Sequence, residues 1–303
     1  MSNSTSFTNF TTSLKTKQNV NRIFFSILML TLMGTSAIAQ DGYFQQGEFG
    51  FSLGASHYFG DLNTRSGLNR PKPAIGVFFR KQFGNYVGMR VSGHYAQVGY
   101  SDVYSKNEYQ RVRNLSFNSN IFEFAVQGDF NFFKYVPDDM VYNFTPYVTL
   151  GLGVFSYDPY TFYNGEKYYL RNLYTEGPQN TYGTMAVCVP LGVGIKYSLN
   201  KKVNLSFEIA QRFTTTDYLD DVSTKYADAS EFPLGPVDPN TNLPTYTPAF
   251  LLQDRSWEIL GMDNRLSSVP GRQRGWSKQK DQYVIAEIGI SFNLGSYKCP
   301  TAF

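Results

Sequence analysis

The sequence is poor in residues that support redox or metal chemistry. It contains two cysteines and two histidines among 303 residues, too few for a disulfide framework or for a centre with several thiolate or imidazole ligands. Charged residues make up 17% of the chain and the formal net charge is +3, so no basic stripe for nucleic acid is present. We therefore expect no cofactor and no nucleic-acid partner.

The chain also lacks an apolar run long enough to cross a bilayer as a helix, which takes about 20 residues. The apolar segment Ile23–Met33 follows several basic residues and precedes the small residues Ala37–Ala39. This order is typical of a secretory signal peptide. We predict cleavage near Ala39, export across the inner membrane and a mature chain that begins at Gln40.

Aromatic residues and glycines are abundant instead. Aromatics form 17% of the chain and there are 26 glycines, a composition that favours strands and turns over helices. Segments in which apolar and polar residues alternate recur along the mature chain, and a period of two is the signal of a strand. Eight such strands are predicted, at residues 48–59, 74–83, 86–96, 121–133, 147–155, 185–197, 203–213 and 283–294.

Alternation of this kind fits either a secreted sandwich with an apolar interior or an outer-membrane barrel with an apolar exterior. The predicted connections alternate between long and short, as in barrels with long outer loops and short periplasmic turns. The last strand, Glu287–Leu294, also resembles the terminal signal that the barrel-assembly machinery reads during insertion. We therefore predict an all-β fold, an eight-stranded antiparallel transmembrane β-barrel with long extracellular loops and short periplasmic turns, in the outer membrane.

The predicted layout has four parts. They are a signal peptide (1–39), a periplasmic lead (40–46), the barrel (47–294, with a long last outer loop at 214–281) and a periplasmic tail (295–303).

The strand register predicts which side chains enter the lumen of so narrow a barrel. Four basic and four acidic residues share the inward face, and buried charges must be paired. The set forms either a rigid salt-bridged plug or a gated path or proton relay. Its members are Arg80, Arg90, Lys196, Arg212, Glu123, Asp129, Glu208 and Glu287.

The histidines and cysteines each allow two interpretations. His94 faces the lumen as a catalytic base or as a hydrogen-bonded filler. His57 has the outward parity of an interfacial residue, or forms a hydrolase-like dyad with Asp61. Cys188 faces the lumen, and Cys299 lies beyond the last strand, so a disulfide between them is doubtful.

Charged and aromatic residues also gather where strands end. The carboxylates are expected at a membrane–water edge. There they either form a cation site, because hard cations favour clustered carboxylates, or bond loop backbone together with neighbouring Thr side chains and fold the long last loop back over the rim. A basic cluster in the last loop either contacts lipopolysaccharide phosphates or is solvated. Its members are Arg272, Arg274 and Lys278. Aromatics including Tyr58, Tyr147, Tyr157 and Tyr283 are expected in interfacial girdles. The cation candidates are Asp61, Asp217, Asp220 and Asp221.

Four motifs together carry a family resemblance. They are GASHYFGDL (54–62), FTTTDYLDDVS (213–223), RGWSKQKDQY (274–283) and GSYKCPTAF (295–303). The set resembles the PorG-like outer-membrane barrels of the type IX secretion system of Bacteroidota, over nearly the whole mature chain.

The resemblance implies a non-enzymatic component that positions a periplasmic ring of proteins resembling PorK and PorN. Other expected partners are outer-membrane lipids, lipopolysaccharide and the barrel-assembly machinery. The alternatives are a small outer-membrane transporter or surface-adhesion barrel and, more weakly, an outer-membrane hydrolase. Residues placed on the periplasmic side as partner contacts are Asp138, Asp139, Lys298, Cys299 and Pro300.

Overall fold

The computed structural model describes residues 47–64, 67–137, 139–269 and 271–294. The chain divides into two units, 1–42 and 43–303, and every described residue belongs to the second. The signal peptide, the periplasmic lead and the C-terminal tail lie outside the described residues, so these assignments remain predictions.

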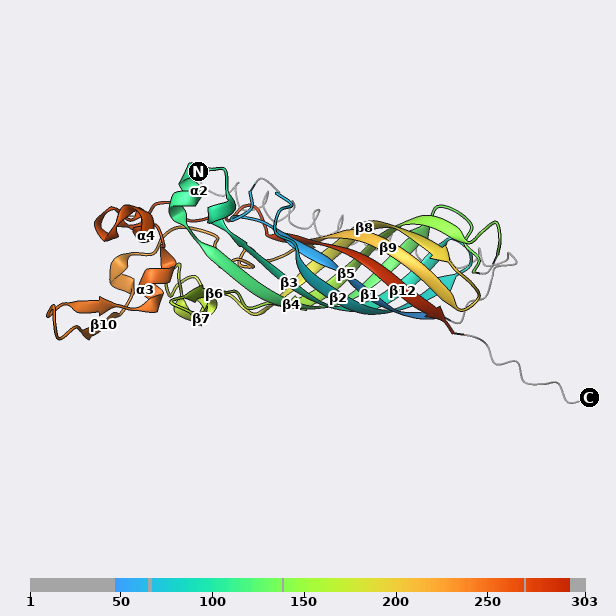
Figure 1. Ribbon diagram of the computed structural model, residues 1–303, viewed down its shortest axis with the longest axis horizontal. Helices are drawn as coiled ribbons and strands as arrows, with labels where there is room; N and C mark the ends of the chain where they lie inside the picture. The colour runs from blue at the N-terminus through green and yellow to red at the C-terminus, as the bar shows by residue number, and fades with distance from the viewer. Residues whose placement is uncertain (1–46, 65–66, 138, 270, 295–303) are drawn as a thin grey trace, which may run out of the picture. The chain divides into compact units, whose positions relative to one another are not determined.

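Eight antiparallel strands close into a barrel (Figure 1), as the alternating sequence predicts. Each strand pairs with its neighbour along the ring, and β12 pairs with β1 to complete it. The strands are β1 (Glu48–Phe59), β2 (Lys72–Phe83), β3 (Val87–Ser101), β4 (Ser116–Asn131), β5 (Phe144–Ser156), β8 (Met185–Ser198), β9 (Val203–Thr214) and β12 (Gln282–Asn293).

Side chains alternate between the outside and the lumen, because successive residues of a strand point to opposite faces. On β4, Phe122 and Phe124 are 61% and 55% exposed, whereas Glu123 and Gln127 are buried. The apolar face therefore points outward, opposite to a soluble sandwich. Among the described residues, no helix is long and apolar enough to cross a membrane.

Two strands extend five residues further than predicted, toward the end of the barrel from which the long connections leave. β3 continues beyond Ala96 to Ser101, and β4 begins at Ser116 instead of Ile121. The added residues pair with one another, from Gln97↔Asn120 to Ser101↔Ser116. These residues are largely polar on their outward side, so no apolar alternation marked them, yet their backbone ladder continues beyond the apolar band.

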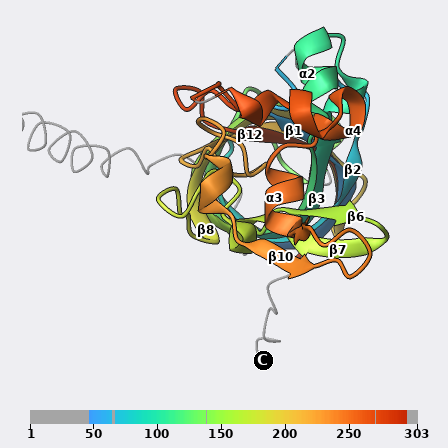
Figure 2. The ribbon, with the colours of Figure 1, turned by 90° about the vertical axis from the view of Figure 1, so that its left-hand side faces the viewer.

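Four long connections leave the same end of the barrel, here called the loop end (Figure 2). They span residues 60–71, 102–115, 157–184 and 215–281. The opposite end, here called the short-turn end, has two tight turns at 84–86 and 199–202 and one connection, 132–143, that is as long as 60–71. The long connections contain secondary structure that the sequence interpretation missed: η2 (Asp102–Tyr104), α2 (Glu108–Arg113), β6 (Tyr160–Tyr163), β7 (Glu166–Tyr169), η3 (Leu170–Leu173), η4 (Ala229–Glu231), β10 (Leu234–Val237), β11 (Pro244–Tyr246), α3 (Pro248–Gln253), α4 (Trp257–Leu260), η5 (Met262–Asn264) and η6 (Leu266–Ser268).

The main hydrophobic core lies toward the loop end. In this core, strand residues near the loop end, such as Phe117 and Tyr283, pack with residues of the long connections, such as Leu219 and Leu252. The prediction of aromatic girdles is wrong for Tyr58, Tyr147, Tyr157 and Tyr283, which are at most 3% exposed. Tyr58, Tyr147 and Tyr283 sit on the inward register of their strands, and the loops cover Tyr157.

Candidate functional site

The short-turn half of the lumen is filled by an ion-pair network. Arg80 lies between two carboxylates, with Nη1 2.7 Å from Glu48 Oε1 and Nε 2.7 Å from Asp129 Oδ2. Lys196 Nζ is 3.4 Å from the same Asp129 oxygen. All four side chains are buried, so each charge is neutralised by a partner and not by water.

A second pair spans the middle of the lumen. Arg90 Nη1 lies 2.6 Å from Glu208 Oε2, and Tyr147 donates its hydroxyl to the same carboxylate at 2.7 Å. Because Arg90 is on β3 and Glu208 on β9, this pair ties opposite walls of the barrel together.

The third network lies closer to the loop end and centres on Glu123. This carboxylate is 3.2 Å from Arg212 Nε, 3.3 Å from His94 Nδ1, and accepts the Tyr283 hydroxyl at 2.6 Å. His94 Nε2 is 3.3 Å from Glu287 Oε2. Both ring nitrogens of His94 thus face carboxylates. This geometry fits a hydrogen-bonded side chain that fills the lumen and bridges two acids.

The structure brings all eight predicted lumen residues inside the barrel, each at most 5% exposed. It adds Glu48 and His94 to the ion pairs. Glu48 has the same parity as Gly50 and Ser52 on β1, so register alone could have found it. Cys188 is also buried there as a free thiol, 4.0 Å from Glu123.

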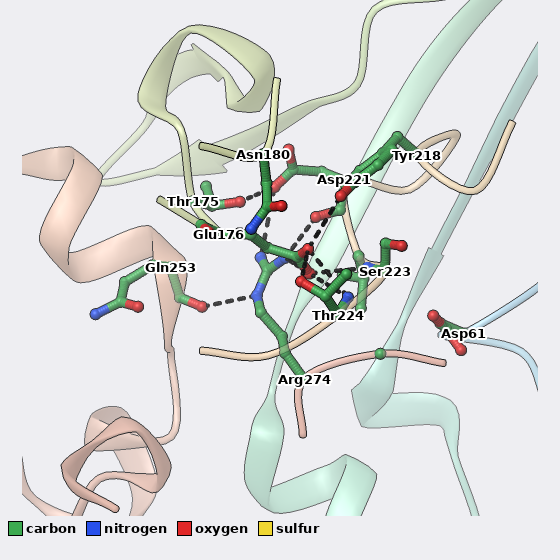
Figure 3. Close-up of polar contacts among 12 residues, drawn as sticks. Asp61, Thr175, Glu176, Asn180, Tyr218, Asp221, Ser223, Thr224, Gln253 and Arg274 are labelled. Atoms are coloured by element: carbon green, nitrogen blue, oxygen red, sulfur yellow. Dashed lines mark hydrogen bonds and ion pairs between the residues drawn. The ribbon is translucent and has the colours of Figure 1, made fainter. Parts of the chain in front are cut away.

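Above the lumen, a buried arginine ties the long connections together (Figure 3). Arg274 is 2% exposed; its Nη1 lies 3.1 Å from Glu176 Oε1, and its Nε donates to the Gln253 carbonyl at 3.0 Å. It also contacts Asp221 through the backbone carbonyl and through Oδ2, the latter at 3.4 Å. We call Glu176, Asp221, Gln253 and Arg274 the Arg274 clasp.

Glu176 extends the clasp to the acidic motif of the last connection. Its carboxylate accepts hydrogen bonds from the backbone N–H of Ser223 at 2.8 Å and of Thr224 at 3.0 Å, and from the Thr224 hydroxyl at 2.7 Å. Glu176 belongs to connection 157–184, so two segments far apart in sequence share one buried anchor.

A second arginine fastens the connection between β3 and β4. Arg113 forms a bidentate pair with Asp102, at 2.7 Å and 2.8 Å. Its remaining donors reach the Arg274 carbonyl at 2.6 Å and the Asp61 carbonyl at 3.0 Å. Planar guanidinium forks suit such shared recognition, so Arg113 and Arg274 together hold all four long connections.

A pair of carboxyl groups shares a phenol at the centre of this region. The Tyr58 hydroxyl lies 2.5 Å from Asp220 Oδ2 and 3.0 Å from Asp281 Oδ1. A phenol has one proton to donate, so the second contact requires a protonated carboxyl. Burial, and then the charge of Asp281, raises the pKa of Asp220 well above its usual range; burial and nearby aspartates do the same to the pKa of Asp281.

The predicted acidic rim is therefore buried and not exposed. Asp217, Asp220 and Asp221 are each at most 3% exposed, and Asp61 accepts the Trp276 backbone N–H at 2.9 Å. Burial raises the pKa of Asp217 to about 6, and it raises that of Asp221 to about 6 despite Arg274. The expectation of a membrane–water edge is wrong, because connections 157–184 and 215–281 fold over these residues; the last loop does fold back over the rim, as expected.

The described residues contain no group of three or more His, Cys, Asp or Glu side chains that could hold a metal ion. The prediction of a cation site at Asp61, Asp217, Asp220 and Asp221 is not supported. These carboxyl groups instead face protein donors, such as the Ser223 hydroxyl 2.6 Å from Asp217.

His57 is not an interfacial residue. It is 4% exposed because the connection 60–71 covers it: Nε2 lies 2.5 Å from the Gly67 carbonyl and 3.2 Å from Asn63 Nδ2. These neighbours, and not Asp61, fix the ring, so the hydrolase dyad has no geometric support.

The remaining predicted residues divide by position. Asp139, in the turn between β4 and β5, accepts the backbone N–H groups of Val141 and Tyr142 at 2.8 Å and 3.1 Å. Of the basic cluster, Arg274 is buried, Arg272 is half-buried and Lys278 is exposed. Four proposed contacts lie outside the described part of the chain: Asp138, Lys298, Cys299 and Pro300.

Comparison with solved structures finds small bacterial outer-membrane proteins at very low sequence identity. Neisserial surface protein A is 6% identical, with a TM-score of 0.40, over 82% of this chain and 97% of that one. Ail of Yersinia pestis is 8% identical (TM-score 0.38; 83% and 99% covered), and OprG of Pseudomonas aeruginosa is 9% identical (TM-score 0.37; 84% and 98% covered).

No curated protein matches the sequence. A family model described as "Domain of unknown function (DUF6089)" matches residues 21–244, well over half of the chain. The chain belongs to the DUF6089 family.

Proposed function

We propose that this protein is a non-enzymatic scaffold of the outer membrane. In this proposal the barrel conducts no solute. Its short-turn end holds a periplasmic protein partner, and its loop end carries a folded cap. The filled lumen is the observation that carries the proposal.

The outer surface supports placement in a membrane. Outward side chains on every wall are apolar and exposed, although soluble proteins rarely expose continuous apolar patches beyond a few hundred Å². Barrels that cross a bilayer present such a band to lipid. Representative residues are Leu53 (67% exposed), Ile75 (51%), Leu152 (66%), Val193 (60%) and Ile288 (65%). The predicted signal peptide adds the export that this location needs, and the barrel-assembly machinery is the expected route of insertion.

The lumen argues for a scaffold over a transporter. Each of its buried carboxylates lies within 4.0 Å of a cationic or imidazole group, and the Arg90–Glu208 pair bridges opposite walls. Opening a path would separate buried charges, and removing one partner of such a pair costs about 3–5 kcal/mol. A plug of this kind stabilises the barrel and blocks conduction.

The narrower proposal comes from the sequence motifs. Their resemblance to PorG-like barrels supports a role in a type IX secretion apparatus, in which the short-turn end would position a periplasmic ring of proteins resembling PorK and PorN. Asp139 and the segments around it, together with the C-terminal tail, are the proposed contacts. At the other end, Arg272 and Lys278 are proposed to meet lipopolysaccharide phosphates.

Co-purification from native membranes tests the partner. We expect the full chain to retain periplasmic ring proteins, and a chain ending at Leu294 to lose most of them while still folding. As the matched control, a chain lacking the exposed β10–β11 hairpin should retain the ring. Equal recovery of ring proteins with and without the tail would refute the tail contact, and an absence of ring proteins from both would refute the secretion role.

A second candidate, a surface-binding barrel of the adhesion type, is favoured by one feature: the loop end is a folded surface with hollows and not a set of open loops. Normal secretion in a deletion strain, together with lost surface attachment, would favour this candidate over the first.

A further inference from the structure

The loop end has a hollow of about 750 Å³ beside the Arg274 clasp, within the roughly 300–1,000 Å³ range of ligand sites. Its floor is a short antiparallel pairing: Arg274 N–H donates to the Thr224 carbonyl at 2.9 Å, and Tyr226 N–H to the Arg272 carbonyl at 3.1 Å. The Glu176 carboxylate holds Thr224, one residue of this pairing, by accepting its hydroxyl. The hollow is therefore preorganised, since it is built on hydrogen-bonded backbone.

One wall of the hollow is an exposed tryptophan on an anchored backbone. The Trp276 side chain is 51% exposed, but its backbone is anchored. The backbone N–H donates to Asp61 Oδ2 at 2.9 Å, and the backbone carbonyl accepts the Gln279 N–H at 3.2 Å. The residue also borders a second hollow of about 450 Å³. Trp276 thus presents an exposed indole from an anchored backbone, and an indole offers a flat apolar face.

Planar polar groups also line the hollow. Asn180 is fixed by donating Nδ2 to the Glu176 carbonyl at 2.7 Å (Figure 3), and the exposed amide of Gln179 lies beside it. Around the rim, the cation Lys225 is offset by the acids Asp228 and Glu231. The hollow thus has no positive excess to attract an anionic ligand.

We propose that this hollow binds a neutral oligosaccharide. One sugar ring stacks its C–H face on the Trp276 indole, and its hydroxyl groups exchange hydrogen bonds with the amides of Asn180 and Gln179. An indole and planar amides that line the same hollow match a ligand that has an apolar face and an edge of hydroxyl groups. This site does not depend on the secretion role.

Fluorescence titration of the full chain in detergent tests the proposal. The chain has two tryptophans, so the variant Trp257→Phe leaves Trp276 as the only reporter. Neutral di- and trisaccharides are the probes, and their sulfated counterparts are the comparison. We expect a saturable change with at least one neutral saccharide. Calorimetry should show that Trp276→Ala weakens its binding by about tenfold or more, that Asn180→Ala also weakens it, and that Trp257→Phe leaves it unchanged.

Four outcomes would overturn the proposal. They are no binding by any neutral saccharide, binding of sulfated saccharides alone, unchanged affinity in folded Trp276→Ala, and quenching of Trp276 by brominated lipid in vesicles, which would make it a membrane-interface residue. Heat-dependent gel migration of each variant separates lost binding from lost folding.

Discussion

Arg274 is the residue on which closure of the loop end depends most directly. It is buried against Glu176 and Asp221 and also donates to a backbone carbonyl of α3. Its replacement leaves two carboxylates without their cation in a dry environment, and such a loss costs about 3–5 kcal/mol.

We therefore predict that Arg274→Ala opens the loop end without unfolding the barrel. Limited proteolysis should cleave connection 215–281 faster, while the heat-dependent gel shift of the barrel is retained. Lys278→Ala, a change at an exposed position in the same motif, is the control and should be cleaved like the natural protein. Unchanged protection in Arg274→Ala would contradict the clasp.

The buried aspartates give the loop end a pH dependence. The pKa of Asp217 and of Asp221 is raised to about 6 in the folded chain, above an unfolded value of about 4. A carboxyl group with a raised folded pKa contributes stability that is present at low pH and lost as pH rises through that pKa. The loop end should therefore be more stable at about pH 5 than at about pH 8.

Hydrogen exchange over residues 215–281 measures this effect. Protection, corrected for the intrinsic rate at each pH, should fall as pH rises. Asp217→Asn should flatten the dependence, because the amide cannot ionise. Protection that rises with pH would show that ionised aspartates stabilise this region and that the assignment is wrong.

At the scale of elements, the alternating sequence was sufficient for the eight barrel strands and their facing, because an apolar exterior and a narrow polar lumen impose a strict period of two. It was insufficient for the loop end. The contact between Glu176 and Thr224 joins connections that are distant in sequence. Helix α3 begins at an N-cap residue, Thr247, in a segment that has no apolar periodicity to mark it. The buried acids were misplaced for the same reason, since burial there comes from segments distant in sequence.

Two glycines on neighbouring strands test the register. Gly76 on β2 lies opposite His94 in the lumen, and a Cβ there would come within 2.5 Å of both the His94 ring and the Ser52 hydroxyl. Gly93 on β3 faces outward, and its Cβ would meet nothing closer than 3.8 Å.

We predict that Gly76→Ala destabilises the folded barrel by about 1–3 kcal/mol, the usual cost of overpacking, and that Gly93→Ala changes its stability little. Urea unfolding in detergent, followed by gel shift, measures both. Equal midpoints for the two variants would mean that the lumen has room for a methyl group at Gly76 and that the third network is less tightly packed.

At the scale of the whole molecule, a rigid plugged barrel joins two ends with different surfaces. The Arg90–Glu208 ion pair of the lumen links opposite walls, and the buried arginines bind the four long connections into one cap. In the proposed scaffold role such a body would hold partners in place, because buried ion pairs fill its lumen.

Electrical recording in planar bilayers tests this account most directly. We predict that the folded protein gives no steady conductance at either polarity. Arg90→Ala should lower the urea midpoint of unfolding and still leave the barrel closed, because the networks around Arg80 and Glu123 remain. A stable, reproducible conductance in the natural protein would contradict the filled lumen and favour a transporter.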